Sequence, residues 1–394
     1  MELAWDPEID TPATIAVIGG GPVGVEAALY ARFLGYSVLL FDSYKVGHRQ
    51  LAWGHYLMHE PWSVVTSPLG LAALRAQGAV GDLPESDTQV SYREYVEKYL
   101  LPVARTDLLY DSVQINSPVI SISRTGCDDP STPARQRRAE QEFRVLVDSK
   151  QRGEYTQLVD IILDCSGLAP RRGLASGGGL AIGESAQRAH ASVGKMDVLR
   201  KHRERFAGKH VLLYGRDWNA AANALDLAQL ASESAETRTT WIVPKRIGAT
   251  SALELPATCD VGLQAAAQEL LSNNHPGVVS LPAWGIESLQ LSEARWQVRL
   301  QTSDEDTLDI AGDVFISCPP RLAEWSFCDR LLLPGEPQLE VLSPEPHYYV
   351  LGEKLWGESA GLATAWPQIR QAFALIGGRA DLDLYATIAK QNAG

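Results

Sequence analysis

Apolar and polar positions follow a regular order near the start of the chain. A short apolar run at residues 14–18 is followed by a glycine-rich turn, by apolar residues at helical spacing over 23–34, and by a second apolar run at 37–41. Short unbroken apolar runs are typical of buried strands, and a spacing of three and four residues is typical of an amphipathic helix. The pattern therefore predicts a strand, a helix and a strand, the opening of a parallel α/β domain.

The same order returns after His210. A strand is predicted over 211–214, a helix over 220–230 and a strand over 239–243. The remaining predictions, in chain order, are an irregular segment over 45–90, a helix over 92–101 closed by Pro102, strands over 119–123, 142–147 and 158–163, an exposed loop over 124–140, strands within 280–318 ending in 314–317, a strand over 348–351 and a helix over 363–376. Two openings in 394 residues predict two α/β domains.

Charge and hydropathy exclude several classes of partner. The net charge is −13, so the basic face that nucleic acid requires is not expected. No apolar run approaches the roughly 18 to 20 residues that span a bilayer. The first fourteen residues carry four acidic and no basic residues, unlike a signal peptide, and we expect a cytoplasmic protein.

Five cysteines are spread through the chain without a C-x-x-C pair and without zinc spacing. We therefore expect free, buried thiols and no metal site. A disulfide reductase would need two closely spaced cysteines, so we do not expect that activity.

The first turn contains a glycine fingerprint. Gly19, Gly21 and Gly24 form G-x-G-x-x-G directly after a predicted strand, with Pro22 at the start of the predicted helix. The first glycine allows a tight turn, the second lets a diphosphate approach the backbone, and the third lets the helix pack against the strand. Asp42 ends the second strand, where a carboxylate accepts hydrogen bonds from ribose hydroxyls. These residues predict a dinucleotide at the helix N-terminus.

The layout of two such units resembles the two-dinucleotide-binding-domain flavoproteins, which include thioredoxin reductase-like enzymes and flavin monooxygenases. The resemblance implies that FAD is bound near the N-terminus and that an inserted domain binds NAD(P)H. It gives an α/β fold with a Rossmann-type FAD domain and a second, inserted Rossmann-type domain. The boundaries are the first part of the FAD domain at 1–170, a connection at 171–208, the NAD(P)-binding-like domain at 209–318 and the return of the FAD domain at 319–394.

Shorter segments extend the resemblance. Ser166 and Gly167 follow Asp164 and Cys165 at a strand end that is similar to a segment next to the FAD. Gly352 and Glu353 resemble a late motif whose acid binds the FAD, although the family usually has Asp there. Val119 corresponds to a position whose backbone meets the adenine. The resemblance implies that these residues bind FAD.

The second fingerprint carries opposing signals. Gly215 and Ala220 match the pattern, but Asp217 stands at the central glycine, where its side chain blocks and its charge repels a diphosphate. Lys245 and Arg246 follow the next strand, a position at which the family's basic residues suit the 2′-phosphate of NADPH. Both an NADPH site and a retained fold with a lost site remain open.

One stretch after the second strand contains candidate catalytic residues. It includes His55, His59 and Trp62, and it resembles a stretch of flavin-dependent monooxygenase-like proteins. The histidines would move protons near neutral pH and Trp62 would wall the flavin or substrate. A structural loop with packed aromatics is the alternative. Gly177-Gly178-Gly179 is interpreted as a hinge or a phosphate loop.

The resulting hypothesis is an NADPH-dependent, monooxygenase-like FAD enzyme that acts on a small metabolite. One alternative is an oxidase or dehydrogenase that takes hydride directly from its substrate, which Asp217 favours. Another is a flavin-binding scaffold without turnover. The sequence leaves homodimer formation open.

Overall fold

The computed structural model describes residues 13–58, 60–78, 83–127, 138–170, 174, 180–248, 252–255, 261–272, 275–303, 305–331, 343, 345–356 and 362–393. The chain divides into two compact units. Unit 1 comprises Met1–Leu168 and Ala323–Gly394, and unit 2 comprises Ala169–Leu322. Two short strands at the boundaries, β8 (Leu168–Pro170) and β17 (Arg321–Ala323), pair with each other.

Unit 1 is built on a five-stranded parallel sheet in the order β18-β7-β1-β2-β3. The strands are β1 (Thr14–Ile18), β2 (Ser37–Phe41), β3 (Val113–Gln114), β7 (Ile161–Asp164) and β18 (Tyr348–Val350). Ile18, the last residue of β1, is in register with Phe41 of β2 and with Asp164 of β7. The carboxyl ends of three strands therefore meet at one edge of the sheet, where the glycine turn begins.

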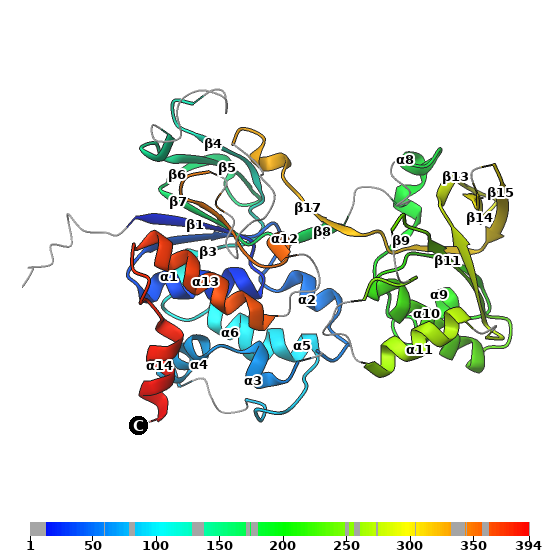
Figure 1. Ribbon diagram of the computed structural model, residues 1–394, viewed down its shortest axis with the longest axis horizontal. Coiled ribbons are helices and arrows are strands. Elements are labelled where there is room, and N and C mark those ends of the chain that lie inside the picture. The colour runs from blue at the N-terminus through cyan, green and yellow to red at the C-terminus, as the bar shows by residue number, and fades with distance from the viewer. Residues whose placement is uncertain are drawn as a thin grey trace, which may run out of the picture. The chain divides into compact units, whose positions relative to one another are not determined.

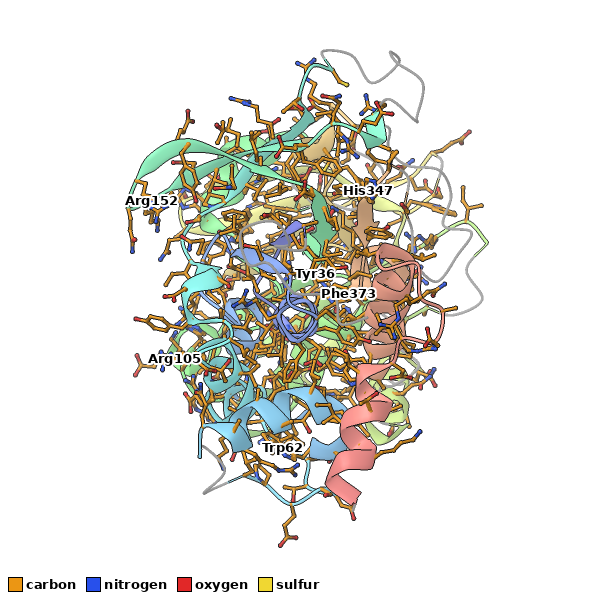
Figure 2. The ribbon with its side chains drawn as sticks, turned by 90° about the vertical axis from the view of Figure 1, so that its left-hand side faces the viewer. Tyr36, Trp62, Arg105, Arg152, His347 and Phe373 are labelled. Carbon is orange, nitrogen blue, oxygen red and sulfur yellow. The ribbon has the colours of Figure 1, made fainter. Side chains whose placement is uncertain are left out.

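Helices cover one face of this sheet (Figure 1). They are α1 (Pro22–Phe33), α2 (His48–Ala52), α3 (Trp62–Val65), α4 (Pro68–Ala76), α5 (Tyr92–Tyr95), α6 (Leu101–Ala104), α13 (Leu362–Ile376) and α14 (Leu384–Ala393), with short turns η1 (Val96–Leu100) and η2 (Tyr110–Ser112). Two further elements, α12 (Glu353–Trp356) and η4 (Ser326–Cys328), instead contribute Leu355 and Cys328 to the core on the other face. Phe373 of α13 stacks on Tyr30 of α1 at 4.9 Å and meets Tyr36 at 6.1 Å (Figure 2). These aromatic contacts fix α13 to the segment that follows the first strand.

An antiparallel sheet covers the other face. Its strands are β4 (Val119–Arg124), β5 (Phe143–Ser149) and β6 (Gly153–Val159). Ile15 and Val17 of β1 pack in the core on the helical side, and Ala16 and Ile18 pack in the core that includes the antiparallel sheet. Alternate residues of a strand point to opposite faces, so an unbroken apolar strand fits between two layers.

Unit 2 repeats this architecture. Its parallel sheet has the order β12-β11-β10-β16-β9. The elements are α8 (Glu184–Gln187), η3 (Arg188–His190), β9 (Ser192–Val193), α9 (Arg203–Phe206), β10 (His210–Tyr214), α10 (Trp218–Glu233), β11 (Arg238–Pro244), α11 (Val261–Ser272), β12 (Val278–Ala283), β13 (Gly285–Ser292), β14 (Arg295–Gln301), β15 (Thr307–Gly312) and β16 (Val314–Ser317). Val211 and Leu213 face the core with α10, whereas Leu212 and Tyr214 face the antiparallel strands β13 to β15.

The predicted α/β fold class is confirmed, and β1, β2 and β16 begin and end where the sequence predicts. Four local predictions are wrong. Residues 45–90 include α2, α3 and α4 and are not irregular throughout. Pro102 does not end its helix. The helix continues through a π-helical turn in which Leu101 N–H donates to Val96 O. Pro102 then lies in the first turn of α6, where its missing N–H removes no helical hydrogen bond.

The other two errors concern the antiparallel sheet of unit 1. The strand predicted over 158–163 is two strands, since β6 ends at Val159 and β7 begins after Asp160, whose carboxylate accepts a hydrogen bond from Thr14 N. Of the loop predicted as exposed over 124–140, residues 128–137 lie outside the described residues. The prediction is wrong at its ends, because the side chains of Arg124 in β4 and of Arg138 are both fully buried on Glu345. Two guanidinium groups on one carboxylate keep these polar residues inside the fold.

Candidate functional site

The glycine loop after β1 uses its three glycines in two ways. A Cβ at Gly19, which has φ +106°, would lie 2.6 Å from the backbone oxygen of Cys165, and a Cβ at Gly24 would lie 1.8 Å from the oxygen of Gly19. Both positions are therefore fixed by backbone packing. Gly21 differs, because its φ of −78° suits any residue and a Cβ there would meet nothing within 4 Å. The space above Gly21 is open.

Gly21 is also the N-cap of α1. It supplies no side-chain hydrogen bond, Pro22 follows at the start of the helix, and the first turn has no acidic residue. The N-terminal N–H groups of a helix carry a partial positive charge and need an acceptor from elsewhere. An uncapped helix end with open space before it suits the diphosphate of a dinucleotide.

Asp42 lies directly after β2, beside this loop. Its Oδ2 accepts a hydrogen bond from Gly20 N at 2.6 Å, and its Oδ1 accepts one from Tyr44 N at 2.7 Å. Each carboxylate oxygen can accept a further hydrogen bond, so two ribose hydroxyls can donate to the same group. The backbone bonds hold the carboxylate at the loop, and its negative charge disfavours a 2′-phosphate.

The end of β7 contributes a buried ion pair that the sequence did not predict. Lys354 Nζ, in α12, lies 2.5 Å from Asp164 Oδ2 and 3.3 Å from Ser166 Oγ. Both charged side chains are fully buried, and the ring of Trp325 covers the ammonium group at 3.9 Å. Tyr348 donates a further hydrogen bond to Asp164 at 2.6 Å. The pair ties the ends of β7 and β18 together beside the glycine loop.

Ser166 and Gly167 are held by the same network. Asp164 Oδ1 accepts hydrogen bonds from Ser166 N at 3.1 Å and from Ser166 Oγ at 2.6 Å. Gly167 has φ +65°, and a Cβ there would lie 3.1 Å from Arg49 Nη1. The guanidinium of Arg49 in turn lies 3.8 Å from Glu353. Arg49 was also missed by the sequence analysis, because a single arginine in a region without a predicted helix carries no pattern.

Gly352 completes this edge of unit 1. It has φ +73°, and a Cβ there would lie 3.1 Å from Val23 at the start of α1. Its N–H donates to Gln368 Oε1 at 2.7 Å. The structure thus brings together around one helix end the residues Gly19, Gly21, Pro22, Gly24, Asp42, Ser166, Gly167, Gly352 and Glu353. These residues fit a bound FAD, because a Cβ at Gly19, Gly24 or Gly352 would meet protein atoms, whereas a Cβ at Gly21 would meet none within 4 Å.

Other predicted residues lie elsewhere in unit 1. Val119 begins β4, pairs with Val147 of β5 and packs against the core, and its contact with an adenine remains a prediction. Trp62 begins α3, is 3% exposed and meets the ring of Tyr99 edge-on at 6.0 Å (Figure 2). The structure gives Trp62 a packing role in the helical layer.

The candidate histidines are only partly described. His55 is half-buried, with its ring 4.0 Å from that of Tyr56. His59 and Gly177-Gly178-Gly179 lie outside the described residues. Their predicted roles therefore stay predictions.

The cysteines that the structure describes are free and buried: Cys127, Cys165, Cys318 and Cys328. Cys165 lies next to the glycine loop, where burial first and Asp164 second raise the pKa of its thiol well above the ordinary value. A thiol that stays protonated is a poor nucleophile. Cys165 therefore packs at the loop and is not suited to disulfide exchange.

The second glycine loop, in unit 2, is closed. Gly215 has φ +145°, and a Cβ there would lie 2.7 Å from Cys318 O, so the tight turn is retained. The N-cap of α10 is Asp217, whose Oδ1 accepts a hydrogen bond from Ala220 N at 2.9 Å and whose Oδ2 accepts one from Asn219 Nδ2 at 2.9 Å. The helix N-terminus already has an anion, and these residues do not fit a dinucleotide diphosphate.

The two basic residues after β11 already have protein partners. Lys245 donates to Thr302 O at 3.0 Å, and Arg246 makes an ion pair with Glu254. Both are exposed. A 2′-phosphate would have to compete with Glu254 for Arg246.

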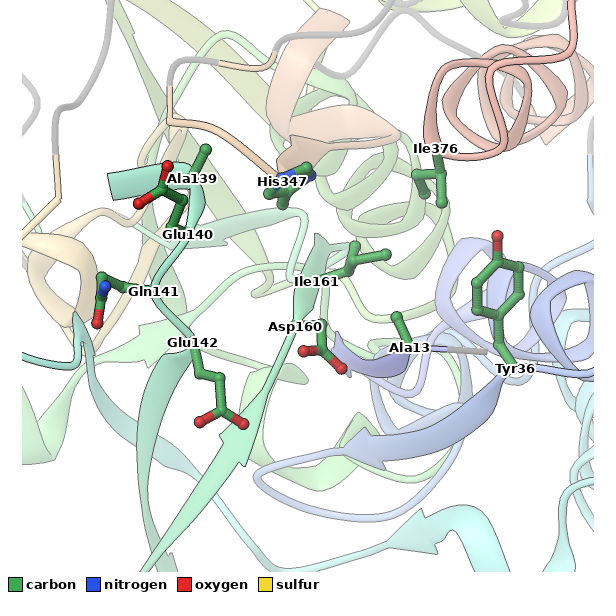
Figure 3. A pocket seen from close by; sticks show the side chains of 10 residues that line it. All are labelled: Ala13, Tyr36, Ala139, Glu140, Gln141, Glu142, Asp160, Ile161, His347 and Ile376. Carbon is green, nitrogen blue, oxygen red and sulfur yellow. The ribbon is translucent and has the colours of Figure 1, made fainter. Parts of the chain in front are cut away.

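A cavity of about 450 Å³ lies at the other edge of the unit 1 sheet (Figure 3). Ala13 precedes β1, Asp160 precedes β7 and His347 precedes β18, so the cavity is at the amino ends of these strands. Open α/β sheets bind ligands outside the carboxyl ends of their strands. The cavity is therefore separate from the glycine loop. Its lining residues are Ala13, Tyr36, Ala139, Glu140, Gln141, Glu142, Asp160, Ile161, His347 and Ile376.

Solved structures share the fold of this chain. The chain has the fold of the two-dinucleotide-binding-domain oxidoreductases. A bacillithiol disulfide reductase from Bacillus cereus is 13% identical with a TM-score of 0.65, over 93% of this chain and 99% of that one. An ornithine hydroxylase from Pseudomonas aeruginosa is 14% identical with a TM-score of 0.59, over 93% and 98%. A thioredoxin reductase from T. acidophilum is 15% identical with a TM-score of 0.57, over 94% and 99%.

No protein-family model matches the sequence, and neither does any curated protein. Among the described residues, no helix has the length and apolar character needed to cross a membrane. The same residues contain no group of three or more His, Cys, Asp or Glu side chains placed to hold a metal ion.

Proposed function

We propose that unit 1 binds FAD non-covalently and that the protein is an FAD-dependent oxidoreductase. The observation that carries the proposal is the N-cap of α1, where Gly21 leaves open space before an uncapped helix end. The FAD diphosphate would lie at this helix end, and Asp42 would accept hydrogen bonds from the adenosine ribose. Ser166, Gly167, Gly352 and Glu353 would border the rest of the cofactor.

FAD, when bound, would supply the two-electron redox chemistry, and the protein would position it and its substrate. The solved structures with this fold include reductases and a hydroxylase, which supports an oxidoreductase acting on a small molecule. A role of His55 or His59 in proton transfer and of Trp62 in shaping the site belongs to this proposal. So do a cytoplasmic location and the option of a homodimer.

The source of electrons has two candidates. An NADPH-dependent monooxygenase is supported by the basic residues Lys245 and Arg246 after β11 and by the hydroxylase with the same fold. Direct oxidation of the substrate is supported by Asp217, which caps the helix that would bind the NADPH diphosphate. The geometry favours direct oxidation. A flavin-binding scaffold without turnover would retain the same FAD site.

The test is the absorbance spectrum of the purified protein after incubation with FAD and removal of the excess. We expect bound flavin with bands in the visible region, and a folded protein that retains none would contradict the proposal. Anaerobic addition of NADPH and of NADH then separates the candidates, because bleaching by either nucleotide supports the NADPH-dependent enzyme. A bound flavin that only a small metabolite bleaches supports direct oxidation. A bound flavin that is bleached neither by the nucleotides nor by a small metabolite supports the scaffold without turnover.

A further inference from the structure

The two glycine loops share one backbone framework. Gly19 and Gly215 both have positive φ, and a Cβ at either would lie within 2.7 Å of the oxygen of the cysteine after the neighbouring strand. The N-cap residues also agree, since Gly21 has φ −78° and ψ −178° and Asp217 has φ −83° and ψ −178°. The two loops therefore follow the same backbone path at these positions, and at the N-cap they differ in the side chain.

In unit 2 this side chain stands where a diphosphate would accept hydrogen bonds. Asp217 is 7% exposed and accepts from Ala220 N in the first turn of α10, a bond that a bound phosphate oxygen would otherwise make. Displacing the carboxylate would leave a buried negative charge next to the phosphates. The two like charges would repel strongly where water is scarce.

A second segment closes the same helix end. Glu254 N donates to Arg216 O at 2.8 Å, and the backbones of Glu254 and Asp217 form an isolated parallel β-bridge. The carboxylate of Glu254 binds Arg246 and lies 3.8 Å from Arg216 Nε. The segment around Glu254 thus runs beside the N-cap and adds a further negative charge, which is paired with Arg246, the candidate for a 2′-phosphate, and with Arg216.

We infer that unit 2 is a dinucleotide-binding fold closed by its own carboxylate, and that NADPH and NADH do not bind at its glycine loop. The consequence for the reaction rests on the proposed function. The electrons would then come from the substrate itself, and a small alcohol or amine is the simplest class that can give them. Such a substrate loses a hydride from carbon and a proton from oxygen or nitrogen, so that a C=O or C=N bond forms. Bound FAD would supply the hydride acceptor, and dioxygen or an organic acceptor would take up the two electrons and two protons.

The experiment is titration of the FAD-loaded protein with NADPH and NADH by calorimetry. We expect no saturable binding by the wild type up to about 1 mM. Asp217→Gly reopens the helix end and should bind NADPH at least tenfold more tightly than the wild type. Asp217→Asn keeps the shape of the cap without its charge and should fall between them. The bound flavin is measured in the same samples by absorbance, so loss of FAD is distinguished from failure of the inference.

Controls make each outcome decisive. Asp309→Asn makes the same change in charge on an exposed strand of unit 2, where the side chain of Asp309 is 66% exposed, and should not alter binding. Thermal unfolding establishes that each variant folds, and Asp217→Asn tests the effect of charge even if the glycine variant is unstable. Micromolar binding of NADPH by the wild type would overturn the inference. So would equal affinities of the wild type and both folded Asp217 variants.

Discussion

Unit 1 and unit 2 share the same glycine turn, but the helix N-terminus after the turn is open in unit 1 and capped in unit 2. Both place a positive-φ glycine against the backbone oxygen of a cysteine, but α1 begins at Gly21 with open space and α10 begins at Asp217 with an internal cap. The packing glycine is required by the fold itself, because any side chain would collide with backbone. The fold does not require a particular residue at the N-cap, so it can persist after its ligand site has closed.

The two units also differ at the end of the strand that neighbours the glycine turn, β7 in unit 1 and β16 in unit 2. Asp164 of β7 and Ser317 of β16 occupy the same register position opposite the last residue of β1 and of β10. Asp164 is charged and paired with Lys354, whereas Ser317 is neutral. The strand end beside the open loop of unit 1 therefore holds a buried charge pair, whereas the corresponding strand end of unit 2 holds a neutral side chain.

The largest expected effect comes from copying unit 2 into unit 1. Gly21→Asp places a carboxylate at the uncapped end of α1, where repulsion of about 4 kcal/mol from a phosphate at 4 Å weakens FAD binding by roughly 1,000-fold. Fluorescence titration of the flavin-free protein measures this affinity. Gly21→Ala is the matched control for size and should bind FAD more tightly than Gly21→Asp. Equal affinities of the two variants would mean that charge at the N-cap is irrelevant.

The next effect tests the buried pair at the strand end. Lys354→Met removes the partner of Asp164 and should lower the free energy of unfolding by roughly 3–5 kcal/mol, because an uncompensated buried carboxylate remains. Ser317→Ala at the corresponding place in unit 2 removes one hydrogen bond to Leu174 and should cost about 1 kcal/mol. Urea unfolding of both variants measures the contrast. Similar losses in both would show that the charge pair has no special weight.

A pH effect is expected from Glu26, a buried residue of α1 in unit 1. Burial raises the pKa of Glu26 from its ordinary 4.5 to about 7, while hydrogen bonds with Ser67, Tyr385 and Tyr99 oppose the rise. The corresponding position of α10, counted from the glycine loop, is Ala222. The folded state binds the proton more tightly than the unfolded state. Stability is therefore greatest below the unfolded pKa and falls as the pH rises from about 4.5 to about 7.

The size of this loss is on the order of 3 kcal/mol, since one pKa unit corresponds to about 1.4 kcal/mol. Glu26→Gln cannot ionise and should remove this part of the slope. Urea unfolding of both proteins across this range tests the expectation through the difference between them. Parallel pH profiles would show that Glu26 does not ionise differently in the folded protein.

The smallest effect concerns the cap of unit 2. Asp217→Ala removes the acceptor of the Ala220 N–H and should lower the free energy of unfolding by about 1 kcal/mol. Asp217→Asn can still accept this bond and should lose less. Thermal unfolding compares the two. An alanine variant as stable as the wild type would mean that the carboxylate does not act as a cap.

The sequence predicted the first strand, helix and strand because each has a strong local signal. Unbroken apolar runs bounded by glycine and Asp42 define β1 and β2, and the three glycines define the turn between them. The helices α2 and α3 were missed since they are only five and four residues long, too short for a periodic pattern.

The charged parts of the site were less accessible. Asp164 and Lys354 are 190 residues apart, and no spacing rule connects residues at such a distance. Asp217 was recognised as an obstacle to phosphate, but its hydrogen bond to Ala220 N depends on the geometry of the helix start. Residue type predicted the repulsion, and the structure supplied the bond that holds the carboxylate in place.

The most direct test of this account is the number of dinucleotides that each chain binds when it is offered FAD and NADPH together in excess. Absorbance after equilibrium dialysis counts both. The account predicts one FAD and no NADPH per chain, because one helix end is open and the other is capped. A folded protein with no FAD, or one with both nucleotides bound, would contradict it.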